Sequence, residues 1–225
     1  MAKVITIVCV LNQQKDAPYT VEWVNKLKNM VAIHLKQPYY FVCMSNVPVN
    51  LDGVSCIPLR YNFPGWWAKM EIFREAPESR VLYLDLDVLI YRDLQPIVDF
   101  PADFAIGPSY GHPDVHRKKR VRGVRPGYNS SVMAFDRGDL TEEIWEKFNK
   151  NSGRWIRQYR GDQDFLQEFF PDLDTLPAKW IPKLGGCITK EGEFKPSKHA
   201  KVILCMPKKN HIMAKQHEFV RQLWQ

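Results

Sequence analysis

The sequence has no apolar run that approaches the roughly 18 residues of a membrane-spanning helix. It also has no internal repeat, no low-complexity stretch and no glycine-rich phosphate loop of the GxGxxG or Walker type. Five cysteines are scattered along the chain, without a CxxC pair or a Cys/His pair at zinc spacing: Cys9, Cys43, Cys56, Cys187 and Cys205. These absences argue against a membrane span, a repeat protein and a zinc module, and they predict a reducing, cytoplasmic location.

The composition is that of an ordinary globular protein. Of the 225 residues, 45% are hydrophobic and 25% are charged, which excludes wholesale disorder, collagen and coiled coil. A chain of this length buries roughly 70% of its unfolded surface, so it can form a substantial core without disulfides. No linker divides the sequence, and we expect a single domain over residues 1–225.

Positive charge is concentrated in the second half of the chain. The formal net charge is +7, but residues 1–111 hold 10 Lys and Arg against 11 Asp and Glu, whereas residues 112–225 hold 22 against 14. A basic half favours an anionic partner, such as a phosphate-bearing substrate, nucleic acid or a membrane surface. Solubility is the plainer explanation for scattered lysines.

Strand and helix patterns alternate along the first 90 residues. The segment Val4–Val10 is continuous and β-branched, as in a strand buried on both faces of a sheet, and it lacks the cleavage site of a signal peptide. The other elements expected here are a helix over 17–36, strands over 39–44 and 54–59, a helix over 66–75 and a strand over 80–84. This alternation predicts an α/β fold, an open sheet flanked by helices.

The second half is less regular. Strands are expected over 103–107 and 130–135, on either side of a basic insertion at 112–126. Helices are expected over 139–150 and 162–170, and a strand over 201–206 precedes a closing helix over 213–224.

The strand over 80–84 runs directly into the motif Asp85-Leu86-Asp87. Alternation along a strand would put residues i and i+2 on the same side, so that both carboxylates leave the strand together. Ligands bind at the carboxyl edge of an open α/β sheet, and paired carboxylates suit Mg²⁺ or Mn²⁺ bound to a diphosphate. An isolated DxD is more often a capped turn, but the apolar residues on both sides favour a metal site here.

Several segments in order carry a family resemblance. They are Val4–Leu11, Trp66-Trp67-Ala68-Lys69 with Phe73-Arg74, Tyr83–Asp87, Tyr128–Met133 and Gly161–Asp164. In that order they resemble the nucleotide-binding first strand, the WxK…FR helix, the DxD metal motif, the N-S-G-V-M strand and the DQ helix start of GT-A-fold glycosyltransferases. The chain is similar to the family-8-like nucleotide-sugar transferases, such as galactinol synthase and glycogenin, over roughly residues 3–210.

The resemblance implies a GT-A (Rossmann-like) open mixed sheet, a nucleoside-diphosphate sugar as donor (a UDP-sugar above all), and Mn²⁺ or Mg²⁺ held by Asp85 and Asp87. Catalytic or orienting roles are implied for Asn129, Asp162 and Gln163. Donor contacts are implied for Leu11, Asn12, Lys69, Arg74, Lys208 and Lys209.

The chain departs from the family pattern near its C-terminus. Family members commonly end with F-H-G-x-x-K-P, whose His is the third metal ligand and whose Lys contacts the diphosphate. The matching stretch here runs from Leu204 to His211 and keeps two lysines, but it has Cys205 or Met206 at the His position. The third ligand is therefore expected to be His211 or water, with weaker metal binding as a further outcome.

Plainer explanations exist for some of these residues. Lys69 and Arg74 lie five apart on an expected helix, where long basic side chains often lie along the surface. At least one of Trp66 and Trp67 is expected in the core, and an exposed one could stack on a base or a sugar. Asp162 could simply cap a helix.

Two basic segments point to the acceptor. Residues 112–126 carry a balance of +5, and residues 154–160 interleave arginines with aromatic residues. Such segments can hold a phosphate backbone and stack bases, although a phosphorylated glycan, an acidic lipid surface or an acidic protein patch would serve as well, and a solvated loop needs no ligand. The acceptor contacts expected are Arg117, Lys118, Lys119, Arg120, Trp155 and Arg157.

The function expected is a metal-dependent glycosyltransferase for hexose or pentose, retaining by resemblance, acting on a hydroxyl of a glycan or of a hydroxylated base in DNA. An inverting enzyme would need a carboxylate base, which Asp162 or Asp164 could supply. Two other classes stay open. They are a metal-dependent nucleotidyltransferase or nuclease, and a nucleic-acid-binding protein whose aspartates are vestigial.

Overall fold

Seven strands form the central sheet in the order β3-β2-β1-β4-β7-β6-β8. The computed structural model describes residues 4–14, 19–75, 80–109 and 127–205. Four neighbouring strands are parallel: β1 (Ile5–Leu11), β2 (Tyr39–Ser45), β3 (Ser55–Pro58) and β4 (Arg80–Leu84). Next to them, β7 (Tyr128–Asp136) runs antiparallel to β4 and to β6 (Phe104–Pro108), and β8 (Asp174–Thr175) pairs parallel with β6. The open mixed α/β sheet expected from the sequence is confirmed.

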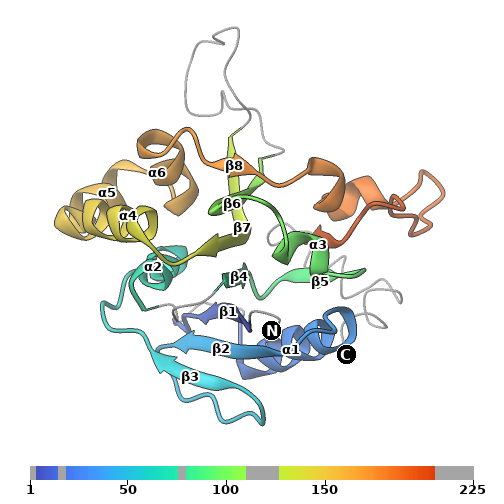
Figure 1. Ribbon diagram of the computed structural model, residues 1–225, viewed down its shortest axis with the longest axis horizontal. Helices are drawn as coiled ribbons and strands as arrows, with labels where there is room; N and C mark the ends of the chain where they lie inside the picture. Colours follow the sequence, from blue (N-terminus) through green and yellow to red (C-terminus); the bar gives the residue numbers. More distant parts are fainter. Residues whose placement is uncertain (1–3, 15–18, 76–79, 110–126, 206–225) are drawn as a thin grey trace, which may run out of the picture.

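Helices cover both faces of the sheet (Figure 1). One face carries α1 (Val21–His34) and α3 (Gln95–Val98). The other carries the 3₁₀ helix η1 (Gly65–Glu71), α2 (Ile72–Glu75), α4 (Asp139–Lys150), α5 (Ser152–Gln158) and α6 (Asp162–Phe169). Among the residues that the structure describes, no helix is both long and apolar enough to cross a bilayer.

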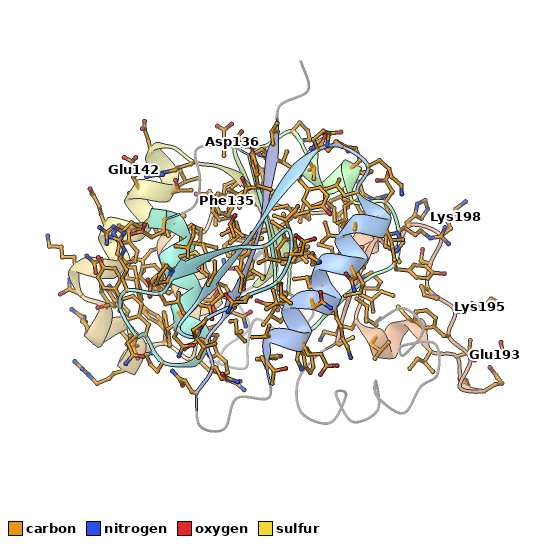
Figure 2. All side chains as sticks on the ribbon, turned by 90° about the horizontal axis from the view of Figure 1, so that it is seen from below. Phe135, Asp136, Glu142, Glu193, Lys195 and Lys198 are labelled. Atoms are coloured by element: carbon orange, nitrogen blue, oxygen red, sulfur yellow. The ribbon has the colours of Figure 1, made fainter. Side chains whose placement is uncertain are left out.

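A second, two-stranded sheet pairs β5 (Val88–Ile90) with β9 (Val202–Leu204) in antiparallel register. It lies on the α1 side, and the short helices η3 (Ala178–Trp180) and η4 (Leu184–Cys187) lead toward β9. The segment between η4 and β9 carries Glu193, Lys195 and Lys198 at the rim of the molecule (Figure 2).

The two faces of the sheet have different cores. The aliphatic core, on the α1 side, includes Val24, Leu27, Leu82 and Leu84. The aromatic core, on the α4 side, is built around Trp67, Phe73, Phe135, Phe148 and Phe165, with Trp67 stacked on Phe148 at 5.5 Å between ring centroids. Successive residues of β4 alternate between the two cores, as side chains along a strand do, so Tyr83 faces the aromatic side.

The structure corrects several expected boundaries. The helix expected over 66–75 is a 3₁₀ helix, which begins at Gly65 with φ +54° directly after Pro64, followed by one turn of α-helix. The basic run at 154–160 was not expected to be helical, but most of it lies in α5, which covers residues 152–158. The insertion at 112–126 and the closing helix at 213–224 lie outside the described residues.

The carboxyl ends of β1, β2, β4 and β6 share one edge of the sheet, because these strands run in the same direction. The start of the antiparallel strand β7 lies at the same edge, since Leu84 pairs with Val132. This edge therefore gathers Asn12 after β1, Asp85 after β4 and residues 129–131 of β7.

A bulge between β6 and β7 shapes that edge. Ile106 pairs with Met133, but the next residue, Gly107, pairs with Asn129, so residues 130–132 of β7 have no partner on β6. A Cβ atom at Gly107 would lie 2.8 Å from the carbonyl oxygen of Asn129, which is too close for any side chain. The glycine therefore allows the two backbones to approach at the bulge.

Candidate functional site

A buried lysine joins polar groups from three segments at the carboxyl edge. Lys69, in η1, is only 6% exposed, and its Nζ lies 2.9 Å from Oδ1 of Asp85 and 3.8 Å from Oδ2 of Asp162. The same ammonium donates hydrogen bonds to the hydroxyl of Ser130 at 3.1 Å and to its carbonyl at 3.3 Å. We call Lys69, Tyr83, Asp85, Ser130 and Asp162 the polar cluster.

Burial and charge tune the groups of the polar cluster. Burial opposes the charged form of Lys69, but Asp162 and Asp85 outweigh it and raise the pKa of the ammonium above its usual value. Burial raises the pKa of the Asp162 carboxyl, although Lys69 and Ser130 act against this shift. Burial also raises the pKa of Tyr83, which stays neutral and donates to Oδ1 of Asp85 at 2.6 Å.

One oxygen of Asp162 is buried with an incomplete set of hydrogen bonds. Oδ2 of Asp162 is buried, and no hydrogen-bond donor from the described residues reaches it, although Lys69 Nζ lies 3.8 Å away. A buried carboxylate oxygen normally accepts hydrogen bonds.

The two aspartates of the DxD motif have different partners. The strand β4 ends at Leu84, and residues 85–87 form a turn in which Val88 N donates to Asp85 O at 3.4 Å. The strand alternation expected from the sequence therefore does not extend to Asp87. Asp85 belongs to the polar cluster. In contrast, Oδ2 of Asp87 accepts a hydrogen bond from the Tyr19 hydroxyl at 3.0 Å.

The donor atoms of Asp85 and Asp87 fit a hard divalent cation, since carboxylate oxygens are the ligands that Mg²⁺ and Mn²⁺ prefer. The described residues contain no group of three His, Cys, Asp or Glu side chains that could hold a metal. His211 lies outside the described residues. Burial raises the pKa of the Cys205 thiol, so this residue stays protonated and offers no ligand to a hard ion.

The loop after β1 is tied to the start of η1. Nδ2 of Asn12 donates to the carbonyls of Phe63 and Gly65, both at 2.9 Å, and Gly65 N donates to Oε1 of Gln14 at 3.3 Å. Oδ1 of Asn12 is buried without a donor from the described residues. The side chain of Leu11, just before Asn12, is fully buried in the aliphatic core.

Asn129 and Gln163 stand next to the polar cluster in the chain but take no part in its ion pairs. Oδ1 of Asn129 accepts a hydrogen bond from Ser131 N at 3.1 Å, which shapes the start of β7. Gln163 is exposed at the second position of α6, directly after Asp162.

Other expected site residues lie elsewhere. The Arg74 guanidinium donates to the Tyr61 hydroxyl and lies over the Trp145 ring, on the α4 side, and not against the polar cluster. Trp155, an expected acceptor contact, is only 8% exposed, and its Nε1 donates to the carbonyl of Lys147 at 3.0 Å. Arg157 is exposed on α5. Outside the described residues lie Arg117, Lys118, Lys119, Arg120, Lys208 and Lys209.

Sequence reasoning missed three residues of the site. Tyr83 could have been found, because it precedes Asp85 by two residues along the chain. Ser130 lies in the segment Tyr128–Met133, which carries the family resemblance, but the sequence did not indicate a role for this residue. Tyr19 gave no signal, since it contacts a residue 68 positions away.

Solved structures show the same fold. The galactosyltransferase LgtC, crystallised with donor and acceptor sugar analogues, matches with a TM-score of 0.64 at 16% identity, over 90% of this chain and 87% of that chain. The bifunctional glycosyltransferase WbbM matches with a TM-score of 0.64 at 14% identity, over 92% and 46%. The glycosyltransferase GlyE of Streptococcus pneumoniae TIGR4 matches with a TM-score of 0.57 at 16% identity, over 79% and 46%.

The match spans less than half of the WbbM and GlyE chains, but most of LgtC. No protein-family model matches the sequence, and no curated protein sequence matches it. At such low identities the structural likeness establishes the fold alone. The chain therefore has the fold of the GT-A glycosyltransferases, as the resemblance of its motifs implied.

Proposed function

We propose that this protein is a metal-dependent glycosyltransferase that moves a sugar from a nucleoside-diphosphate sugar, a UDP-sugar above all, to an acceptor hydroxyl. The observation that carries the proposal is the polar cluster at the carboxyl edge of a GT-A sheet, with the unsatisfied Oδ2 of Asp162 in it. The likeness to LgtC, which was crystallised with donor and acceptor sugar analogues, supports it.

In this proposal Asp85 and Asp87 hold Mn²⁺ or Mg²⁺. When bound, the cation neutralises negative charge on the diphosphate of the donor. Lys69 and Tyr83 contact Oδ1 of Asp85 and fix the orientation of this carboxylate. Tyr19 does the same for Asp87 through Oδ2.

Asp162 would orient the sugar that is transferred. Its Oδ2, which lacks a hydrogen-bond donor among the described residues, would accept a hydrogen bond from a sugar hydroxyl, and Lys69, 3.8 Å from the same oxygen, helps to hold the carboxylate in place. Because these groups are buried, they position the sugar without competition from water. We propose retention of the anomeric configuration, which NMR of the product tests directly, and Asn129 and Gln163 as further contacts.

The protein's acceptor would be a hydroxyl of a glycan. A hydroxylated base in DNA is the alternative, and it depends on the basic insertion at 112–126. We further propose a cytoplasmic location, which is supported by five cysteines that are all free thiols.

A panel of nucleotide sugars, with and without Mn²⁺, tests the function through release of nucleoside diphosphate. We expect metal-dependent release by the wild-type protein and a loss of about a hundredfold or more in Asp85→Asn. Asp52→Asn, at an exposed loop position, is the matched control and should keep full activity.

Three outcomes would contradict the proposal. Release of pyrophosphate would indicate a nucleotidyltransferase. DNA binding without turnover of any donor would indicate a nucleic-acid-binding protein. Full activity of Asp85→Asn at saturating metal would remove the metal site from the mechanism.

A further inference from the structure

Trp66 is an exposed aromatic residue on an otherwise buried helix. Its side chain is 59% exposed, whereas Trp67, Ala68, Lys69, Met70 and Glu71 of the same helix are buried. A single exposed aromatic residue is common on protein surfaces and needs no explanation by itself. What distinguishes Trp66 is how firmly the indole is held and where it lies.

A hydrogen bond and the space left by a glycine determine where the indole lies. Nε1 of Trp66 donates a hydrogen bond to the carbonyl of Arg160 at 3.0 Å. At the next residue, Gly161, a Cβ atom would lie 2.7 Å from Nε1 and 3.1 Å from Cδ1 of the indole. Gly161 has φ −168°, an extended conformation open to any residue, so the glycine is required here for space and not for its backbone angles.

The loop that carries Trp66 is held as well. Gly65 accepts a hydrogen bond from Asn12 and donates one to Gln14, so the loop after β1 fixes the residue before Trp66. An aromatic side chain fixed on both sides loses little conformational entropy when a ligand stacks on it. The indole is therefore preorganised for contact.

A series of contacts connects Trp66 to Asp85, one of the two proposed metal ligands. Asp85 contacts Lys69, and Lys69 lies 3.8 Å from Asp162. Asp162 follows Gly161, on which the indole of Trp66 packs. If the transferred sugar lies against the polar cluster, then the next ring outward lies against Trp66.

The exposed indole is suited to a ligand that contains a ring, because a ring can stack on its aromatic face. Its N–H group is already used by Arg160, so an incoming ligand meets the aromatic face. Such a face binds the apolar C–H face of a pyranose or a planar base. The exposed amide of Gln163, two residues beyond Gly161, can accept and donate hydrogen bonds to sugar hydroxyls, which favours the pyranose.

We propose that Trp66 is the stacking platform for the acceptor and that the acceptor presents a pyranose ring to it. This inference rests on the proposed glycosyltransfer, and it adds the class of acceptor and the residue that selects it. Arg160 and Gly161 act as positioning residues, because they hold the indole and need not touch the sugar.

Binding of simple sugars tests the platform without turnover. The probes are methyl β-galactoside, methyl β-glucoside and lactose, and saturation-transfer NMR reports binding to wild type, Trp66→Ala and Trp66→Phe. We expect at least one sugar to bind wild type, with the dissociation constant raised roughly tenfold in Trp66→Ala and less in Trp66→Phe. Tyr40→Ala, which removes an exposed aromatic residue of β2, is the matched control and should bind like wild type.

A second variant tests the positioning of the indole. Gly161→Ala places a methyl group 2.7 Å from Nε1 of the indole, too close for both to keep their places, so it should displace Trp66 and weaken sugar binding about as much as Trp66→Ala. Near-UV circular dichroism and thermal unfolding establish that each variant is folded. Unchanged sugar binding in both folded variants would refute the platform.

Further results would overturn the assignment in other ways. If no sugar of the panel binds wild type, the pyranose assignment is wrong. If Trp66→Ala weakens UDP binding instead, the indole stacks on the donor base. If it weakens binding of a single-stranded DNA oligonucleotide while sugars do not bind, the acceptor is a nucleic acid. Nucleotide release from the donor panel is scored separately, so failure of the proposed glycosyltransfer is distinguishable from failure of the platform.

Discussion

The two sides of the sheet contribute unequally to the site. The aromatic side supplies Lys69 and Tyr83, which both contact Asp85, and Asp162 of α6, which pairs with Lys69. The aliphatic side contributes Tyr19, which precedes α1 and contacts Asp87. The difference teaches that Asp85 belongs to a buried ion network, whereas Asp87 accepts a hydrogen bond from a neutral tyrosine. Substitutions on the two sides should therefore differ in kind as well as in size.

The largest effect is expected from Lys69→Met, which removes the cation of the aromatic side. The buried carboxylate of Asp162 and the partly buried carboxylate of Asp85 would lose their ammonium, and breaking a buried pair in this way costs about 3–5 kcal/mol of unfolding free energy. Urea unfolding measures the loss. Lys26→Met, at an exposed helix pair with Glu22, is the control and should stay within about 0.5 kcal/mol of wild type.

The deficit of Lys69→Met should depend on pH. Without the ammonium, burial raises the pKa of the Asp162 carboxyl further, so the folded protein takes up a proton more readily than the unfolded chain as the pH falls. The loss of stability is therefore expected to be greater at pH 8 than at pH 5. A deficit of equal size at both pH values would show that the ion network is not its cause.

Asp87→Asn tests the second carboxylate of the motif, because it removes the charge of the side chain that Tyr19 contacts. We expect nucleotide release to fall about a hundredfold or more, as for Asp85→Asn, since both carboxylates are proposed metal ligands. The melting temperature should change less than in Asp85→Asn, which also loses the ion pair with Lys69. If Asp87→Asn retains wild-type turnover, Asp87 is not a ligand.

The smallest effect is expected from Tyr19→Phe, which keeps the ring against Trp23 and removes only the hydroxyl. Loss of a hydrogen bond to a metal ligand typically weakens metal affinity 10–100-fold, and we expect about tenfold for Mn²⁺. Electron paramagnetic resonance of free Mn²⁺ measures this affinity without donor. Tyr128→Phe, whose hydroxyl donates to the Phe170 carbonyl away from the motif, should leave it unchanged.

Much of the fold could be predicted from the sequence, because its strands are continuous and apolar. The strand over 80–84 was predicted with its observed bounds, and the helix over 139–150 likewise. The 3₁₀ geometry of η1 was not predicted, because the spacing of apolar residues does not distinguish a short 3₁₀ helix from an α-helix. α5 was missed because Trp155 and Ile156 are adjacent, and so do not show helical spacing.

Less of the site could be predicted. The DxD motif was visible because two carboxylates interrupt apolar residues. The burial of Lys69 was not visible in the sequence, because a lysine in a helical pattern is ordinarily exposed. Only the packing of η1 against β7 and α6 places this side chain inside the protein. Tyr19 reaches Asp87 through tertiary structure alone.

The bulge at Gly107 makes the site sensitive to the exact number of residues in β7. Side chains alternate along a strand, so Asn129 and Tyr128 present opposite faces, and the Tyr128 hydroxyl bonds to Phe170 in the aromatic core. Deleting one residue from 130–132 would exchange these faces. It would turn Tyr128 out of the core and separate the Ser130 hydroxyl from Lys69. Insertions and deletions are therefore far less tolerable here than on the exposed loop between η4 and β9.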